Sequence, residues 1–276
     1  MISKLSAIAA DIDGTLVNKG ENIMPLTKQA ITQLHEEGVL FGLATGRKIG
    51  KSIFDRKEKW GLSFDFDFLI GMNGGQLWDR FHDEIESYFM LDTDTMHEIL
   101  EMMEPLGLNA SIYEDDHMVS MYMDTMIHAS MKRNGIDVIL TNGDMERLCV
   151  KPNYNLLFRF DEAKTEQIKA YANLHPSEKY MGTMTSPGII EFMDPRVNKG
   201  LALHHFARRN NIPVEEIMAF GDMDNDKELL WDAGWGVCLI NGTEDTKAAA
   251  NAITEYSCTE DGMGRYLFDH WINRKE

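Results

Sequence analysis

Two aspartates one residue apart, Asp11 and Asp13, follow the short apolar run Leu5–Ala10 and precede Gly14 and Thr15. Paired carboxylates bind a divalent cation through hard oxygen ligands. One of them can also attack phosphorus as a nucleophile while the other transfers protons. The alternative is an Asp-Gly turn whose aspartates are simply solvated. The pair alone leaves both interpretations open.

A second acidic segment runs from Asp222 to Asp226 at the end of another predicted strand and includes Asn225. Such a segment also suits a helix N-terminus with acidic residues in its first turn. An EF-hand loop would need Gly at its sixth position and Glu at its twelfth, and this segment does not supply both. At one sheet edge the two acidic groups would repel each other unless a divalent cation lay between them. The two segments together therefore predict a Mg²⁺ site.

Lys199, in the stretch Val197–Leu203, stands where a helix is expected to begin. The helix dipole disfavours a cation at that end, so a lysine there is explained if it faces a phosphate or a carboxylate. An ordinary surface lysine is the alternative.

The stretch Leu43–Ser52 ends in Gly-Lys-Ser, as a nucleotide-binding P-loop does. That motif needs a glycine five positions before its second glycine, and here the position is Thr45. Counted from Gly46, the loop is one residue short, so a nucleotide kinase is not predicted. A strand end that leads into a helix N-terminus still offers free N–H groups to an anion.

The elements around these residues alternate between strand and helix. Apolar runs near residues 5–10, 39–44 and 66–71 read as strands, and amphipathic segments such as Pro25–Gly38 separate them. The middle of the chain has weaker strands and interspersed charge, and the α/β pattern resumes at Gly188. The sequence therefore predicts an α/β fold with a Rossmann-like parallel sheet core (residues 1–84 and 188–276) and an inserted α+β domain (residues 85–187).

Composition narrows the range of partners. The 276 residues are 43% hydrophobic and carry a net charge of −18, which indicates a folded, soluble protein that repels nucleic acid and anionic membranes. A phosphorylated substrate then needs a locally positive or metal-bearing site. Three cysteines without a CxxC pair favour a reducing compartment. No apolar run reaches the length of a signal peptide core or a membrane span, so we expect a cytoplasmic protein.

Four motifs in this order, "DIDGTL", "ATGR", "NKG" and "GDMDND", resemble those of the haloacid dehalogenase-like superfamily over essentially the whole chain. The insertion between the second and third motifs resembles the Cof-type subfamily, which has a class IIB cap domain. One segment, "CLINGTEDTK", departs from the alanine-methionine-glycine-asparagine run that is more usual there. Because it lies beyond the catalytic motifs, we expect the departure to have little effect.

The resemblance implies a role for each motif residue. Asp11 would be the nucleophile that forms an aspartyl-phosphate, and Asp13 would protonate the leaving alcohol and then activate water. Mg²⁺ would be held by Asp11, the backbone carbonyl of Asp13, and Asp222. The remaining roles are phosphoryl binding by Thr45, Lys199 and the N–H groups of Ile12 and Gly46, phosphate contact by Asn225, support of the metal and Lys199 by Asp226, and substrate contact by Arg47 and Asn73.

These roles predict a Mg²⁺-dependent phosphatase that acts on small phosphomonoesters such as sugar phosphates, with the cap domain selecting the substrate. A phosphomutase of the same superfamily is one alternative, although the stretch Asn18–Phe41 is too short for the cap that such enzymes usually carry between the first two motifs. A phosphate-binding module without catalysis is the other. The sequence indicates neither the physiological substrate nor the oligomeric state.

Overall fold

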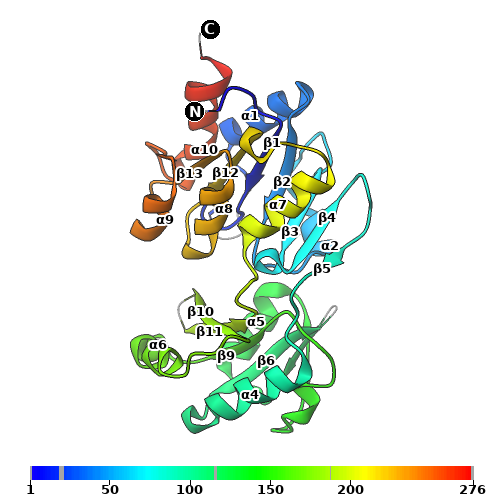
Figure 1. Cartoon of the computed structure of the whole chain (residues 1–276), viewed down its shortest axis with the longest axis vertical. Helices are drawn as coiled ribbons and strands as arrows, with labels where there is room; N and C mark the ends of the chain where they lie inside the picture. The colour runs from blue at the N-terminus through cyan, green and yellow to red at the C-terminus, as the bar shows by residue number, and fades with distance from the viewer. Residues whose placement is uncertain (1, 19–21, 115–116, 187, 275–276) are drawn as a thin grey trace. The chain divides into compact units, whose positions relative to one another are not determined.

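The computed structural model of the chain describes residues 2–18, 22–114, 117–186 and 188–274. The chain forms two compact units, shown in Figure 1. The first consists of Met1–Tyr88 and Val197–Glu276, and the second of Phe89–Arg196. Both boundaries differ from the predicted ones. The second unit begins at Phe89, where residue 85 was predicted, and the first unit resumes at Val197, where residue 188 was predicted.

The first unit is built on an eight-stranded sheet with the order β14-β13-β12-β1-β2-β3-β4-β5. The strands from β14 to β3 are parallel, and β4 and β5 form an antiparallel extension. The predicted α/β class with a parallel sheet core is confirmed. The strands are β1 (Ala7–Ala10), β2 (Leu40–Ala44), β3 (Phe68–Gly71), β4 (Gln76–Asp79), β5 (Glu86–Ser87), β12 (Ile217–Gly221), β13 (Trp235–Cys238) and β14 (Ala252–Ile253).

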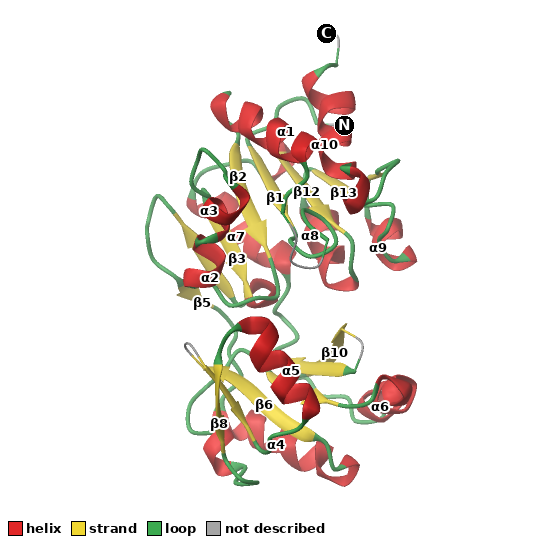
Figure 2. Ribbon diagram, turned by 180° about the vertical axis from the view of Figure 1, so that it is seen from behind, coloured by secondary structure: helices red, strands yellow, loops and turns green. Residues whose placement is uncertain are grey.

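Helices cover both faces of this sheet (Figure 2). Successive side chains of a strand point to opposite faces, so Ile8 and Ala10 of β1 pack into one core cluster with residues of α1 and α10, while Ala7 and Ala9 pack into another with residues of α7 and α8. The helices are α1 (Pro25–Glu36), α2 (Lys51–Phe54), α3 (Arg56–Trp60), α7 (Lys199–Arg209), α8 (Lys227–Asp232), α9 (Glu244–Ala249) and α10 (Gly262–Leu267).

Short helical turns complete the described part of this unit. Most are single 3-10 turns, and the last is a π-helical turn that continues α10. They are η1 (Met72–Gly74), η5 (Val214–Glu216), η6 (Asp224–Asp226), η7 (Cys258–Glu260) and η8 (Phe268–Ile272).

The second unit is an α+β domain around a six-stranded sheet with the order β10-β11-β9-β6-β7-β8. Apolar side chains of α4 and α6 form a single core cluster with one face of this sheet. The elements are α4 (Thr93–Met103), η2 (Glu104–Leu106), β6 (Asn109–Glu114), β7 (His117–Ser120), α5 (Thr125–Asn134), β8 (Asp137–Leu140), η3 (Glu146–Leu148), β9 (Leu156–Arg159), η4 (Glu162–Lys164), α6 (Thr165–Asn173), β10 (Met181–Ser186) and β11 (Ile189–Met193).

Strand β11 explains the difference at the second boundary. The sequence places Gly188–Asp194 at the resumption of the first sheet, whereas β11 pairs antiparallel with β9 and β10 of the second. Its residues Ile190 and Phe192 pack into the core of the second unit. An apolar run predicts a buried strand but not the sheet that it joins.

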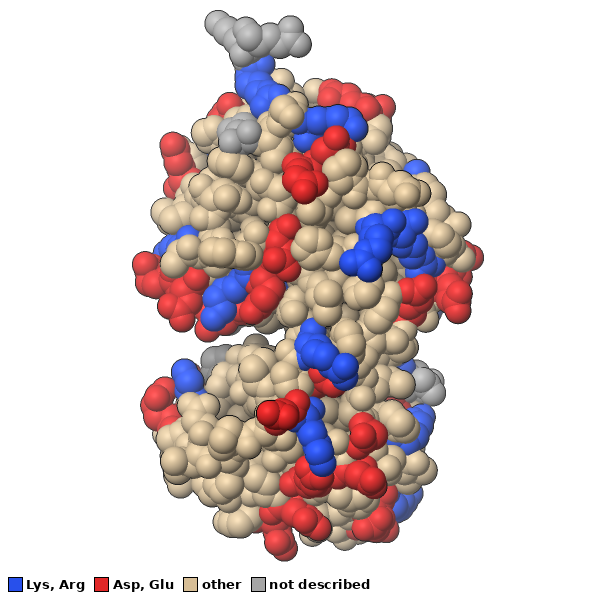
Figure 3. Space-filling model, viewed as in Figure 1, with Lys and Arg blue, Asp and Glu red and all other residues tan. Residues whose placement is uncertain are grey.

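Acidic side chains are spread over the visible surface of both units, with basic ones between them (Figure 3). This distribution fits the net charge of −18. No helix among the described residues combines the length and the apolar character that are needed to cross a bilayer.

Candidate active site

The predicted site residues of the first two motifs lie at the carboxyl ends of the central strands of the first sheet. Asp11 directly follows β1, and Thr45 directly follows β2. Strand β1 lies between β12 and β2, and Asp222 directly follows β12. In open α/β sheets the crevice outside these strand ends is where ligands bind.

Lys199 links the first and last motifs. It is the first residue of α7 and is completely buried. Its Nζ lies 2.7 Å from Oδ1 of Asp11 and 2.6 Å from Oδ1 of Asp226. The two carboxylates compensate for the unfavourable position of a cation at a helix N-terminus. Lys199 is therefore a buried ion-paired residue, and the surface alternative is wrong.

Asp226 orients its neighbours. Its Oδ1 accepts a hydrogen bond from Nζ of Lys199. Its Oδ2 accepts hydrogen bonds from the backbone N–H groups of Asp222 and Met223, both at 3.0 Å. Both oxygens of Asp226 are thus used within the protein. Gly221 lets this carboxylate approach the strand end, since a Cβ at Gly221 would lie 2.5 Å from Cβ of Asp226.

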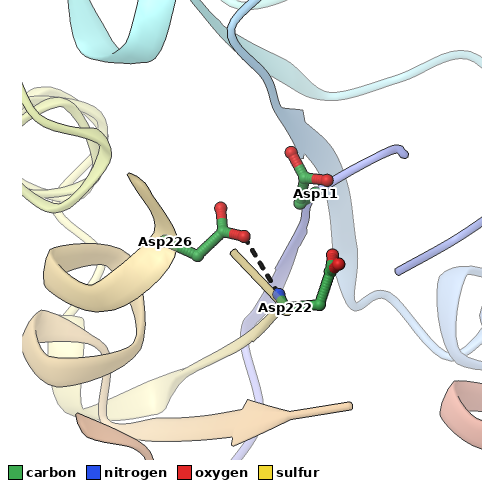
Figure 4. Close-up of side chains that lie close together, drawn as sticks. All are labelled: Asp11, Asp222 and Asp226. Atoms are coloured by element: carbon green, nitrogen blue, oxygen red, sulfur yellow. Dashed lines mark hydrogen bonds between the residues drawn. The ribbon is translucent and has the colours of Figure 1, made fainter. Parts of the chain in front are cut away.

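Asp11 and Asp222 each keep one oxygen free of hydrogen bonds from the described residues. Oδ1 of Asp11 accepts a hydrogen bond from Nζ of Lys199, and Oδ1 of Asp222 accepts one from the hydroxyl of Thr15 at 2.7 Å. Nothing among the described residues donates to Oδ2 of either carboxylate. Figure 4 shows Asp11, Asp222 and Asp226 gathered at one place in the first unit.

The charges of this cluster do not balance. Asp11, Asp222 and Asp226 bring ligand oxygens within 4.8 Å of one another, and Lys199 is the ammonium that pairs with two of them. Burial raises the pKa of Asp11 to about 8 and that of Asp222 to about 7, and the neighbouring carboxylates add to both shifts. Burial alone would lower the pKa of Lys199, but Asp11 and Asp226 raise it, so the ammonium stays charged.

This donor set fits a divalent cation. With all three carboxylates ionised, the one ammonium would leave two negative charges uncompensated. Carboxylate oxygens are the ligands that hard cations prefer, and Asp11 and Asp222 each have one to offer. Gly14 makes room for this arrangement, because its φ is +101° and a Cβ there would lie 2.2 Å from Oδ2 of Asp222.

Asp13 lies next to this cluster and is half-buried. Its Oδ2 accepts hydrogen bonds from Nε and Nη2 of Arg47, at 3.0 and 2.7 Å. The side chain of Arg47 is 41% exposed. The ion pair holds the second carboxylate of the first motif beside a cation that remains accessible to a ligand.

Groups that suit an anion surround the same strand ends. The backbone N–H groups of Ile12 and Gly46 donate to no other described residue. Asn73 lies in η1 with a left-handed backbone (φ +55°), and its N–H donates to the carbonyl of Thr45 at 3.1 Å. Nδ2 of Asn225 donates to Oδ1 of Asn73 at 2.9 Å. Free N–H groups and amides of this kind can bind phosphoryl oxygens.

Two contacts at the site were not predicted. Thr15 was part of the first motif but had no role, and its hydroxyl fixes Asp222. Asn241 lies 227 residues after Gly14, yet its Nδ2 donates to the carbonyl of Gly14 at 2.9 Å. A hydroxyl two residues after Asp13 could have suggested the first contact. No local signal in the sequence indicates the second.

The fold and the site are those of an α/β enzyme whose carboxylates and buried lysine lie at the carboxyl ends of the parallel strands. The sequence model of the haloacid dehalogenase-like hydrolases matches residues 8–267, and the chain belongs to this family. The predicted family and the predicted enzyme class, a phosphoric monoester hydrolase, are confirmed by this match and by the phosphatase names of the relatives.

Two curated relatives span nearly the whole chain. The HMP-PP phosphatase of Yersinia enterocolitica is 27% identical over 270 residues (96% of this chain and 94% of the relative). The 5-amino-6-(5-phospho-D-ribitylamino)uracil phosphatase YwtE of Bacillus subtilis is 28% identical over 288 residues (95% and 97%). The fold is that of a solved structure described as the HAD subclass IIB sugar phosphatase BT4131, with a TM-score of 0.78, 21% identity, and coverage of 96% of this chain and 98% of that one.

Proposed function

We propose that the chain is a Mg²⁺-dependent phosphatase that hydrolyses small phosphomonoesters, such as sugar phosphates and related metabolites, through a phosphorylated Asp11. The observation that carries this proposal is the state of the Asp11 carboxylate. One oxygen is fixed by the buried Lys199, and the other is free of hydrogen bonds from the described residues. A carboxylate held in this way is oriented for attack on phosphorus.

The first half of the reaction forms a bond between one carboxylate oxygen of Asp11 and phosphorus, and the bond from phosphorus to the ester oxygen breaks. Asp13 gives its proton to the departing oxygen, so that an alcohol leaves. Lys199 and the free N–H groups of Ile12 and Gly46 would neutralise the charge on the phosphoryl oxygens. Thr45, Asn73 and Asn225 are close enough to one another to position the group.

The second half transfers the phosphoryl group to water. Asp13, now ionised, accepts a proton from the attacking water, and the bond between Asp11 and phosphorus breaks with the electron pair returning to the carboxylate. Inorganic phosphate leaves, and both aspartates are restored. Arg47 keeps Asp13 at the site between the two steps.

Asp11, the backbone carbonyl of Asp13, and Asp222 would hold the Mg²⁺ ion. When bound, the ion supplies the positive charge that the cluster of carboxylates lacks. Asp226 would support this arrangement through Lys199 and the backbone of Asp222, since both its oxygens are already occupied. The second unit would act as a cap that selects the substrate.

The substrate class rests on the names of the relatives, which are phosphatases of small organic phosphates. The acidic composition argues against nucleic acid as a partner, and the three cysteines without a CxxC pair favour the cytoplasm as the place of action.

The test is phosphate release from a panel of sugar phosphates, nucleotides, pyridoxal phosphate and flavin mononucleotide, each with Mg²⁺ and with chelator. We expect release that requires the metal and is lost in Asp11→Asn, while Asp55→Asn, an exposed residue paired with Lys51, serves as the matched control. Exchange of phosphate between sugars without release would instead indicate a mutase. Binding of phosphate without either reaction would indicate a non-catalytic module.

A further inference from the structure

The segment "CLINGTEDTK" was expected to have little effect because it lies beyond the catalytic motifs in the sequence. In space, part of it contacts both acidic loops of the candidate site. The first contact is made by Asn241, whose Nδ2 donates to the carbonyl of Gly14 at 2.9 Å. The other end of the same amide is fixed, because Oδ1 of Asn241 accepts the N–H of Cys258 at 2.9 Å. Asn241 thus ties the Asp11–Thr15 loop to the beginning of η7.

The second contact is made two residues later. The N–H of Thr243 donates to the carbonyl of Asp222 at 2.9 Å, and its hydroxyl donates to Oδ1 of Asp224 at 2.6 Å. Gly242 makes this approach possible, since a Cβ there would lie 2.8 Å from the carbonyl oxygen of Asp222. Asn241 and Thr243 therefore hold one acidic loop each from a single short turn.

The two loops also touch each other. Thr15 donates to Asp222, and the carboxylate of Asp222 occupies the space next to Gly14 where a side chain would otherwise stand. A small movement of the Gly14 backbone would therefore change the separation between the carboxylates of Asp11 and Asp222. Oxygen ligands must stay within a narrow range of distances to bind a cation such as Mg²⁺.

We propose that Asn241 is a positioning residue that, together with Thr243, sets the separation of the Asp11–Thr15 and Asp222–Asp226 loops and thereby the affinity of the site for its divalent cation. This inference rests on the proposed function only for its catalytic consequence. The consequence for metal binding stands on the carboxylate cluster itself. Asn241 is not among the residues proposed to hold the cation or the phosphoryl group.

Asn241 is exposed, so its replacement leaves the core of the unit intact. The test uses the full-length protein and Mn²⁺ as the probe, with the free ion followed by electron paramagnetic resonance. In Asn241→Ala we expect Mn²⁺ affinity and kcat each to fall about tenfold, with KM little changed, as is typical when a residue behind metal ligands is removed.

Asn241→Asp separates positioning from simple electrostatics. The substitution keeps the acceptor for Cys258 but loses the donor to Gly14, and it adds a negative charge near the site. A purely electrostatic effect would tighten Mn²⁺ binding, whereas loss of positioning weakens it. Asn251→Ala is the matched control, because its Oδ1 accepts the N–H of Gly236 on β13 at 2.7 Å and it contacts neither acidic loop.

The inference is overturned if folded Asn241→Ala and Asn241→Asp bind Mn²⁺ and turn over substrate as the unaltered protein does. It is also overturned if Asn251→Ala weakens Mn²⁺ binding equally, since the effect would then be a general loosening. Because Mn²⁺ binding needs no turnover, the result is independent of the proposed activity. Weakened binding in a protein that hydrolyses no ester would preserve the inference and remove the phosphatase.

Discussion

Buried aspartates at two places in the first unit differ in how completely their oxygens are used. Asp79, at the end of β4, accepts hydrogen bonds from the N–H groups of Phe81 and His82 and from the side chains of His82 and Asn210. Its Oδ2 also forms an ion pair with Nε of Arg209 at 3.1 Å. Burial alone would raise the pKa of Asp79, but these donors lower it. In contrast, Asp11 and Asp222 each retain an oxygen without a donor among the described residues, and their pKa values are raised.

The difference indicates what each group does. A buried carboxylate with a full set of donors is stable as an anion and pins β4 to α7 and to its own hairpin. Burying a carboxylate that lacks donors costs folding free energy unless a proton or a bound cation neutralises its charge. The same residue type therefore stabilises the fold at one place and could hold a cation at the other.

The largest expected effect is that of Asp11→Asn on turnover. The amide cannot act as the nucleophile, so we expect phosphate release to fall by at least about a thousandfold. The folded protein should remain as stable as before or become more stable, because the repulsion among the three buried carboxylates decreases. Phosphate release and urea unfolding of the same preparation measure both quantities. Undiminished turnover would contradict the proposed role of Asp11.

Lys199→Met should reduce kcat by about a hundredfold, because the phosphoryl oxygens and Asp11 lose a buried cation. The metal-free protein should also lose about 3 kcal/mol of unfolding free energy, since two buried carboxylates lose their counter-ion. Turnover at saturating Mg²⁺ and chemical denaturation with chelator test the two effects. A variant with unchanged kcat would mean that Lys199 only supports the fold.

Asp79→Asn should show the opposite pattern. Arg209 would lose the carboxylate of Asp79 and keep that of Glu86, and we expect a loss of about 3 kcal/mol of unfolding free energy. Turnover per folded molecule should stay the same, because Asp79 has no part in the proposed chemistry. Urea denaturation and an active-site titration distinguish the two. A specific loss of kcat in a fully folded variant would remove the distinction between Asp79 and the aspartates of the candidate site.

The smallest expected effect is the pH dependence of metal stabilisation. A carboxyl with a raised folded-state pKa stabilises the metal-free fold while it holds its proton. This contribution is fully present below the ordinary pKa of 3.8. It is lost as the pH rises through the folded-state pKa, which is about 8 for Asp11 and about 7 for Asp222. A cation binds the ionised forms, so the increase in Tm that Mg²⁺ causes should be larger at about pH 8 than at about pH 6. Scans with and without chelator at both values measure it. An increase independent of pH would mean that the metal does not displace protons from these groups.

The sequence predicted the α/β class and the meeting of Asp11, Thr45 and Asp222 at one sheet edge, because each of them directly follows an apolar strand. For Lys199 the helix N-terminus left two alternatives, an anionic partner or the surface, and the structure has the first. The prediction that β11 belongs to the first sheet was wrong, since its apolar pattern suits either sheet. The contact of Asn241 with Gly14 could not be predicted, because a hydrogen bond between distant loops depends on packing that no local pattern reports.

The most direct test of the central claim is to stop the reaction with acid during turnover and to locate the phosphoryl group by mass spectrometry of peptides. The proposed mechanism predicts phosphate on the peptide that contains Asp11, in an amount that depends on Mg²⁺, and none in Asp11→Asn. An enzyme that turns over rapidly while no acid-trapped phosphate appears on Asp11 under any condition, or that carries it on another residue, would contradict the account.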